Sequence, residues 1–304
     1  MTVASCRGAV LFGTLCIIVS AAWSADGAPR SDFRVDSKLV LIPVSVTDPN
    51  NHAVTGLSRE VFHIFEGKVE QTLVQFAAED APVSIGIVFD SSGSMRNKLA
   101  ASRDAVARFL ELANPEDEFF LVDFNATARV TIPFTCDAGL IRNQLSLTQP
   151  GGRTALLDAV TLAIDSMKSA RNPRRALLIL SDGDDNDSRY TEFEIRRRVR
   201  ESDLWIYSIG LDDRLGVILP EEDHGSTLLS HLAAASGGRY FTVQNSSELT
   251  EAAATIGLEL RNQYVIGYRP AAPARSGGYH KVQVRLMAGR DLRVTFRPGY
   301  YDSE

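Results

Sequence analysis

The sequence predicts an α/β fold with a doubly wound, mostly parallel sheet, one antiparallel edge strand, and a small β-sandwich formed from both ends of the chain. Three observations support this prediction. Apolar runs typical of buried strands alternate with helical stretches through the middle of the chain. One strand-like run follows its predecessor too closely to leave room for a crossover helix. Shorter segments with period-two alternation lie on both sides of this region.

The outer segments have the pattern of half-buried strands. Apolar residues alternate with others over 40–46, and Pro43 within this run marks an edge or a bulge. β character recurs in the segments 61–65, 72–76, 264–268, 282–286 and 292–296. Neither the first nor the last group has enough strands to bury its own apolar face. We therefore expect residues 37–80 and 262–301 to form one discontinuous β-sandwich.

The middle of the chain alternates strands with helices. Strand-like runs lie at 83–89, 119–122, 176–180 and 204–209. Helical stretches are expected at 97–112, 137–147, 154–170, 190–202, 226–236 and 246–261. This alternation gives a parallel sheet covered by helices on both faces. The run at 128–132 follows the strand at 119–122 too closely for a crossover, so it is expected to be the antiparallel edge strand.

Hard oxygen ligands follow two of the predicted buried strands. The run Asp90-Ser91-Ser92-Gly93-Ser94 follows 83–89, and Asp182 follows 176–180. Thr154 adds a hydroxyl at the Gly-rich start of a helical stretch. In an open α/β sheet, ligands bind outside the carboxyl ends of the strands. Carboxylate and hydroxyl oxygens in this arrangement indicate a site for a divalent cation.

These elements, in this order, resemble the metal-ion-dependent adhesion site of the von Willebrand factor type A (VWA) family. The resemblance covers residues 82–258 and implies a Rossmann-like fold for them. It also implies that Ser92 and Ser94 bind the metal directly, with Thr154 as a direct or water-bridged ligand. Asp90 and Asp182 would then act largely through waters and hydrogen bonds.

The family resemblance also implies a cofactor and a partner. Mg²⁺ suits a site that keeps waters and octahedral geometry, and Ca²⁺ or Mn²⁺ are the substitutes. An ion with charge supplied mainly through waters keeps an open coordination position, which the family commonly fills with an Asp or Glu from a protein ligand. We expect no small-molecule substrate.

The flanking segments resemble the bacterial exported "VWFA-related" proteins, in which a β module brackets the VWA domain. The motifs that carry this resemblance are Gly56–Phe62 with Phe65-Glu66-Gly67, and Leu260–Tyr268. The first residues agree with export, because Arg7, a short apolar core and small residues read as a signal peptide over 1–24. Residues 25–36 would be a linker. An uncleaved anchor helix is the alternative, but the apolar core is short for a membrane span.

Composition excludes some classes of partner. Removing Arg7 with the leader leaves 31 basic and 38 acidic residues, so the net charge of −7 disfavours binding to nucleic acid or anionic lipid. Cys6 and Cys16 would leave with the leader, and the remaining Cys136 cannot form an internal disulfide. With no histidine nearby in the sequence, Cys136 is expected to be a structural thiol.

Several residues have competing interpretations. Asp90, Ser92 and Ser94 would serve only as helix caps if Thr154 and Asp182 were unrelated to them. The acidic loop from Asp184 to Asp187 would be a second calcium site, although a solvated loop is favoured because its spacing is not that of an EF-hand. A surface or packing role is expected for two histidines, and ordinary solvation for a basic run. These residues are His224, His231, Arg196, Arg197, Arg198 and Arg200.

The leading function hypothesis is a noncatalytic, metal-dependent protein-binding module for adhesion or assembly, exported to the periplasm, cell envelope or exterior. The alternatives are a structural envelope scaffold with an occupied metal site, and a metal-dependent hydrolase or nucleotide-binding enzyme. The sequence has no G-x-G-x-x-G fingerprint and no Walker lysine after Gly151-Gly152. Ser94 lies in S-G-S-M-R and not in the G-x-S-x-G of a nucleophile elbow.

The leader assignment predicts that export removes about the first 24 residues. Sequencing the N-terminus of the protein recovered from periplasm or medium measures this directly. An intact Met1 in a membrane fraction would show that the segment is an anchor.

Overall fold

The computed structural model describes residues 39–78, 80–211, 224–270, 278–287 and 291–301, with side chains described from residue 227 in the third range. The predicted leader and linker lie outside these residues. No helix within the described ranges is long and apolar enough to cross a membrane.

The central element is a six-stranded sheet in the order β10-β9-β8-β5-β6-β7. Its strands are β5 (Val83–Asp90), β6 (Glu118–Phe124), β7 (Ala128–Thr135), β8 (Arg174–Ser181), β9 (Trp205–Leu211) and β10 (Tyr240–Val243). Neighbouring strands are parallel except β6 and β7, which pair antiparallel. The predicted antiparallel edge strand is therefore confirmed.

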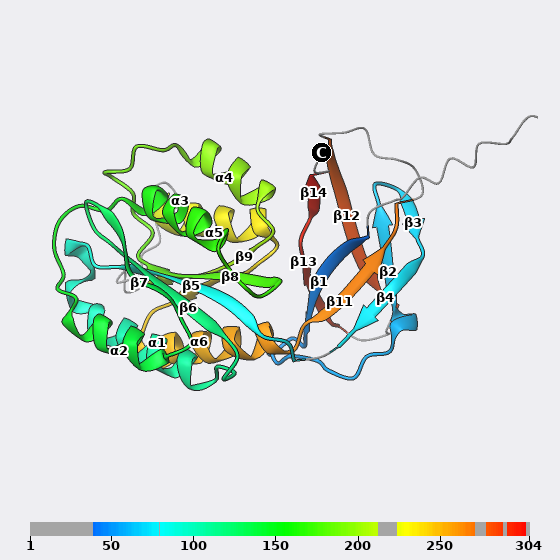
Figure 1. The fold of residues 1–304 in the computed structure, drawn as a ribbon, viewed down its shortest axis with the longest axis horizontal. Coiled ribbons are helices and arrows are strands. Elements are labelled where there is room, and N and C mark those ends of the chain that lie inside the picture. Colours follow the sequence, from blue (N-terminus) through cyan, green and yellow to red (C-terminus); the bar gives the residue numbers. More distant parts are fainter. Residues whose placement is uncertain (1–38, 79, 212–223, 271–277, 288–290, 302–304) are drawn as a thin grey trace, which may run out of the picture. The chain divides into compact units, whose positions relative to one another are not determined.

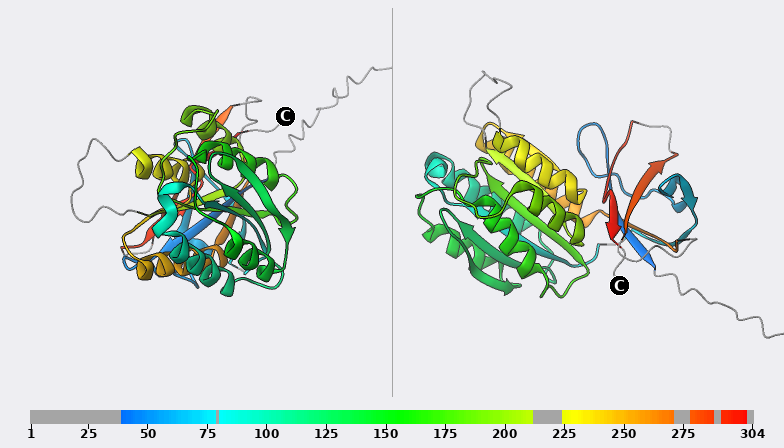
Figure 2. Two further views of the ribbon diagram at one scale, coloured as in Figure 1. Left: turned by 90° about the vertical axis from the view of Figure 1, so that its left-hand side faces the viewer. Right: turned by 90° about the horizontal axis from the view of Figure 1, so that it is seen from above.

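Helices cover both faces of this sheet (Figures 1 and 2). The helices are α1 (Leu99–Glu111), α2 (Ala138–Leu147), α3 (Leu156–Met167), α4 (Glu192–Glu201), α5 (His224–Ser236) and α6 (Ser246–Arg261). One apolar core lies between the sheet and α1, α2 and α6, and a second lies between the sheet and α3, α4 and α5. Two covered faces explain why all eight residues of β5 are buried, as its nearly continuous apolar sequence predicts.

Local signals in the sequence fix several helix starts. The Thr191 side chain accepts from the Glu194 amide and the Glu194 carboxylate binds the Thr191 amide, which completes a capping box at α4. Asn245 caps α6 by accepting from the Glu248 amide. The buried face of α6 includes Leu249, Ala252, Ala253, Ile256 and Leu260, as its helical periodicity predicts.

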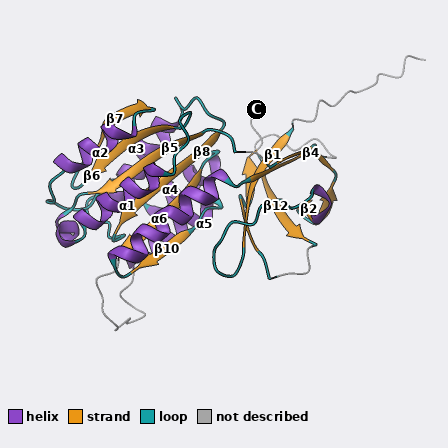
Figure 3. Cartoon of the chain, turned by 90° about the horizontal axis from the view of Figure 1, so that it is seen from below, coloured by secondary structure: helices purple, strands orange, loops and turns teal. Residues whose placement is uncertain are grey.

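The flanking segments form two four-stranded antiparallel sheets. The first has the order β13-β1-β11-β4, from β1 (Val40–Thr47), β4 (Leu73–Ala77), β11 (Tyr264–Tyr268) and β13 (Arg293–Phe296). The second has the order β14-β12-β2-β3, from β2 (Phe62–Glu66), β3 (Val69–Gln71), β12 (Tyr279–Leu286) and β14 (Gly299–Tyr301). Figure 3 shows these strands in orange, and the short 3₁₀ turn η1 (Arg59–Val61) lies just before β2.

Both flanks contribute to one apolar core, so the predicted β-sandwich formed from both ends is confirmed. Val44 of β1, Ile266 of β11 and Ile64 of β2 are fully buried in this core, and Val284 of β12 is buried beside them. Pro43 lies where β1 pairs with β11 alone, because the pairing with β13 starts at Val44. A proline is tolerated there because that side of the strand has no neighbour to receive an amide hydrogen bond.

The sandwich yields a stability prediction. Ile266 is fully buried in the middle strand pair, so Ile266→Ala removes packed methyl groups and should lower the free energy of unfolding by about 2–4 kcal/mol. Leu41, which is 47% exposed on the neighbouring strand, is the matched control, and Leu41→Ala should change stability by less than about 0.5 kcal/mol. Urea denaturation measures both. Equal destabilisation would contradict the assigned core.

Candidate metal site

The candidate site lies where the sheet reverses its strand order. β5 is flanked by β6, the next strand in the chain, on one side and by β8 on the other. The crevice outside the carboxyl ends of two such strands is the usual ligand site of open α/β sheets. β5 ends at Asp90, and β8 ends at Ser181, the residue before Asp182.

Asp90 is fully buried and both of its carboxylate oxygens are engaged. Oδ1 accepts from the Ser92 amide at 2.8 Å, and Oδ2 accepts from the Ser181 hydroxyl at 2.5 Å. Burial raises the pKa of Asp90 to about 6, against the opposing effect of hydrogen bonds from Ser181 and Ser92. The negative charge of Asp182 adds to the rise. A cation beside Asp90 would relieve this penalty.

The two serines after Asp90 face each other. The hydroxyl oxygens of Ser92 and Ser94 are 3.1 Å apart, with Ser92 buried and Ser94 exposed. Adjacent ligands of an octahedral ion with metal–oxygen distances of about 2.1 Å lie about 3.0 Å apart, so the spacing fits Mg²⁺. Ser92 begins the 3₁₀ turn η2 (Gly93–Asn97), but its side chain makes no capping hydrogen bond. The interpretation of these serines as helix caps is therefore wrong.

Backbone hydrogen bonds join the loop that carries Thr154 to the loop after β5. The Gly93 amide donates to the Gly152 carbonyl at 3.0 Å, and the Gly151 amide donates to the Ser91 carbonyl at 2.8 Å. Gly152 has φ of +83°, a conformation that favours glycine. Thr154 is buried and precedes α3 by two residues, so its hydroxyl does not cap that helix.

Asp182 has one engaged and one unengaged oxygen. Its side chain is 10% exposed, and Oδ2 lies 3.5 Å from the Lys98 ammonium. Oδ1 is buried and has no hydrogen-bond partner among the described residues. A buried carboxylate oxygen without a partner is costly unless water or an ion satisfies it. This atom is the strongest sign that the residues present fit a hydrated cation.

The structure adds supporting residues that sequence reasoning missed. Ser181 binds Asp90 directly, and Asp123 at the end of β6 accepts from the Ser91 hydroxyl. Asn186 fixes the loop of Thr154 by accepting from the Thr154 amide at 3.0 Å. Ser181 and Asp123 also lie at strand ends, and this position in the sequence could have identified them as supporting residues.

The acidic loop after β8 has a structural role that neither interpretation anticipated. The Asp185 carboxylate accepts from the Leu156 amide at 3.0 Å and thereby caps α3. Asp187 pairs with Arg153 at 3.3 Å, whereas Asp184 is exposed. Within the described ranges, no three His, Cys, Asp or Glu side chains are grouped to hold a metal. The candidate site has only two carboxylates, and its other oxygen donors are hydroxyl groups.

The other polar candidates lie in surface ion pairs. His231 contacts Glu192 at 2.7 Å, as expected for a surface role, and the His224 side chain lies outside the described residues. The basic run on α4 makes the pairs Arg196–Glu192, Arg197–Glu201 and Arg198–Asp165.

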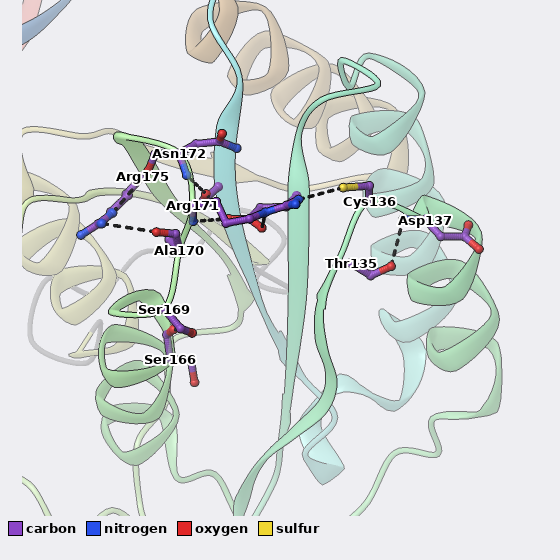
Figure 4. A network of polar contacts seen from close by, with 11 residues as sticks. Thr135, Cys136, Asp137, Ser166, Ser169, Ala170, Arg171, Asn172 and Arg175 are labelled. Carbon is purple, nitrogen blue, oxygen red and sulfur yellow. Dashed lines mark hydrogen bonds and ion pairs between the residues drawn. The ribbon is translucent and has the colours of Figure 1, made fainter.

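Cys136 belongs to a network at the opposite, amino-terminal edge of the parallel strands (Figure 4). The thiol is exposed, and its sulfur accepts a hydrogen bond from Arg171 at 3.1 Å. Arg171 also binds the buried Glu118, whose second partner is the Ser84 hydroxyl. Burial alone would raise the pKa of Glu118, but hydrogen bonds from Ser84 and Arg171 outweigh it and lower the pKa.

A surface pocket of about 420 Å³ lies in the β-sandwich and not at the candidate site. Its lining consists of Arg59, Glu60, Phe62, Glu70, Gln71, Thr72 and Leu73. The candidate metal site instead consists of oxygen donors at or after strand ends, which need no deep cavity to hold an ion.

Known proteins resemble this chain over part of its length. Residues 85–184 match the family model of the von Willebrand factor type A domain. The chain is 27% identical over 229 residues to the human (Homo sapiens) inter-alpha-trypsin inhibitor heavy chain H4, covering 71% of this chain and 23% of that protein. It is 26% identical over 141 residues to an uncharacterised protein of Borreliella burgdorferi, covering 43% and 41%. The chain therefore spans less than half the length of these relatives.

Solved structures show the same fold at low sequence identity. A von Willebrand factor type A protein from Catenulispora acidiphila has a TM-score of 0.52 at 15% identity, covering 90% of this chain and 76% of that one. Proximal thread matrix protein 1 from the mussel byssus has a TM-score of 0.51 at 15% identity, covering 64% and 51%. The solved structures show that the fold is shared, and the matching family model shows that this chain contains a von Willebrand factor type A domain over residues 85–184.

Proposed function

We propose that this chain is a noncatalytic protein-binding module that captures a partner carboxylate through a divalent cation at the end of β5. The buried Oδ1 of Asp182, which has no hydrogen-bond partner among the described residues, is the observation that carries the proposal. The paired hydroxyls of Ser92 and Ser94 support it. Oxygen donors of this kind suit Mg²⁺, with Mn²⁺ or Ca²⁺ as substitutes.

The hydrogen bonds support the roles that the family resemblance implies, with hydroxyls as direct ligands and carboxylates acting through waters. Both oxygens of Asp90 are already occupied by Ser92 and Ser181, which suits a carboxylate that acts on the ion through waters. The Ser92 and Ser94 hydroxyls are the direct ligands, and Thr154 contributes directly or through a water. The bound ion would supply a coordination position that attracts an anionic oxygen.

An enzymatic role has less support. A hydrolase using Ser92 or Ser94 needs a base within hydrogen-bond reach. The four histidines with described side chains contact carboxylates of other segments, in the pairs His52–Asp48, His63–Glu70, His231–Glu192 and His280–Glu66. A structural scaffold with an occupied site remains the second candidate, and partner capture distinguishes it from the first.

Export to the periplasm, cell envelope or exterior is part of the proposal. Its support is the basic start, apolar core and small residues of the first 24 positions. A protein partner that offers an Asp or Glu side chain, and not a nucleic acid, agrees with the acidic composition.

Metal binding should depend on Asp182. Asp182→Ala removes a buried carboxylate from the site and should weaken Mg²⁺ and Mn²⁺ binding at least tenfold, or about 1.4 kcal/mol, in calorimetric titration. Asp184→Ala is the matched control, because Asp184 is exposed two residues away. Capture of partners from envelope extract should then be lost in chelator and with Asp182→Ala. Equal cation affinity in all three proteins would refute the metal site, whereas capture that ignores chelator would place partner binding elsewhere.

The free energy of unfolding should depend on pH because of the buried carboxylate of Asp90. The pKa of this carboxyl is about 6 in the folded protein and 3.8 for an ordinary aspartate, so the folded state holds the proton more tightly. Its contribution to stability is complete below pH 4 and is lost as the pH rises through about 6. In chelator at pH 7, Asp90→Asn should therefore raise the free energy of unfolding by about 1–3 kcal/mol.

Urea denaturation of both proteins across pH 4 to 8 measures this difference. The advantage of Asp90→Asn should vanish near pH 4, and saturating Mg²⁺ should stabilise only the wild type. A stability difference that is independent of pH would show that the Asp90 charge is not its source.

A further inference from the structure

Asp123 lies beside the candidate site and joins two of its loops. It is the next-to-last residue of β6, and both of its carboxylate oxygens accept hydrogen bonds from hydroxyl groups. Oδ1 accepts from Ser91, in the loop after β5. Oδ2 accepts at 2.8 Å from Thr148, the residue that follows α2. Neither hydroxyl belongs to the predicted ligand set, so Asp123 acts on the site through other residues.

The alternation of side chains along β6 explains why these groups meet. Val122 and Phe124 are buried in the core shared with α3, so Asp123 between them faces the side of the sheet that α2 covers. Leu145 of α2 is buried in the core on that side, and Thr148 ends the same helix. Thr148 is only 6% exposed, so water competes little for its hydrogen bond to the carboxylate.

This hydrogen bond holds the start of the segment that carries Thr154. Residues 148–155 connect α2 on one face of the sheet to α3 on the other (Figure 1). Near the end of the segment, the Thr154 amide donates to Asn186 at 3.0 Å. At its start, Thr148 donates to Asp123. A segment that is held at both ends loses less conformational freedom when one of its side chains binds an ion.

Ser91 connects Asp123 to the same segment by a second route. Its hydroxyl donates to Asp123, and its carbonyl accepts from the Gly151 amide at 2.8 Å. Ser91 is 2% exposed and directly precedes the predicted ligand Ser92. Asp123 therefore binds both loops that must face each other across an ion, and hydrogen bonds to a carboxylate are stronger than those between neutral groups.

We propose that Asp123 is a positioning residue of the metal site. By binding Ser91 and Thr148, it holds the segment of Thr154 against the loop of Ser92, so that Thr154 can act as a ligand. This inference rests on the proposed function, because it presupposes an ion with Thr154 among its ligands. It adds a residue outside the ligand set that raises the affinity for the ion through hydrogen bonds between loops.

The test removes the Thr148 hydroxyl and leaves the Asp123 carboxylate in place. Thr148→Val keeps the shape of the side chain, and its affinity for Mn²⁺ in calorimetric titration should be about fivefold weaker than that of the wild type. Thr161→Val is the matched control, because Thr161 is also a buried threonine and its hydroxyl binds the Leu157 carbonyl within α3. This control should bind Mn²⁺ as the wild type does. Circular dichroism melting establishes that each variant is folded.

Two further backgrounds separate positioning from a general loss of structure. In Thr154→Ala the side chain to be positioned is absent, so adding Thr148→Val should cause no further loss of Mn²⁺ affinity. In Asp123→Ala the Thr148 hydroxyl has lost its carboxylate partner, so adding Thr148→Val should again cause no further loss. If Asp123→Ala does not fold, the Thr154→Ala background decides alone.

Several results would overturn the role of Asp123 while leaving the metal site intact. They are unchanged Mn²⁺ affinity in folded Thr148→Val, a loss from Thr148→Val that is equal in the wild type and in either background, and wild-type affinity in Thr154→Ala. A wild type that binds no Mn²⁺ would overturn the proposed function and this inference together.

Discussion

The hydrogen bond from Ser181 to Asp90 is the contact on which the site depends. It joins the ends of β8 and β5, the two strands between which the sheet reverses its order. The other oxygen of Asp90 receives the Ser92 amide and so sets the path of the loop that carries both serine hydroxyls. A buried carboxylate is stable only when its partners compensate for lost hydration. Two donors achieve this in part, as the raised pKa of Asp90 shows.

Around this contact, three loops hold one another in place through backbone groups. The loop after β5 binds the glycines before Thr154, and the loop after β8 returns to Thr154 through the amides of Asn186 and Asp187. Asp185 uses its carboxylate to start α3. Asp185 and Asp187 look like ion ligands in the sequence, but their carboxylates instead hold the loops in place. Preorganised donors of this kind lower the entropy cost of binding an ion.

Local periodicity made most of the fold predictable. Strand ends, helix ranges and the antiparallel edge follow from patterns within a few residues, and the starts of α4 and α6 follow from capping residues. The short strands β3, β10 and β14, of three or four residues each, show too little of a period and were not predicted.

Some residues of the candidate site could likewise be predicted from the sequence, and others could not. The set of Asp90, Ser92, Ser94, Thr154 and Asp182 could be proposed because each residue stands beside a recognisable element. The contact of Lys98 with Leu211 could not, since it joins residues 113 positions apart and depends on the arrangement of several strands. The exposure of Cys136 and the capping role of Asp185 likewise require knowledge of what packs beside them.

The interleaved β-sandwich has a consequence for the order in which the chain folds. β1 to β4 are synthesised before the α/β region, but β1 has no sheet partner other than β11 and β13, which follow it. Ribosomal synthesis of residues 78–263 must therefore finish before β1 can bury Val44 and Ile42 against those partners. The α/β region is itself contiguous and can fold in that interval, which brings α6 and hence β11 towards their place. Until then β1 and β4 lack their sheet neighbours, whereas β2 and β3 can already pair with each other. Unpaired edges of this kind favour intermolecular strand pairing.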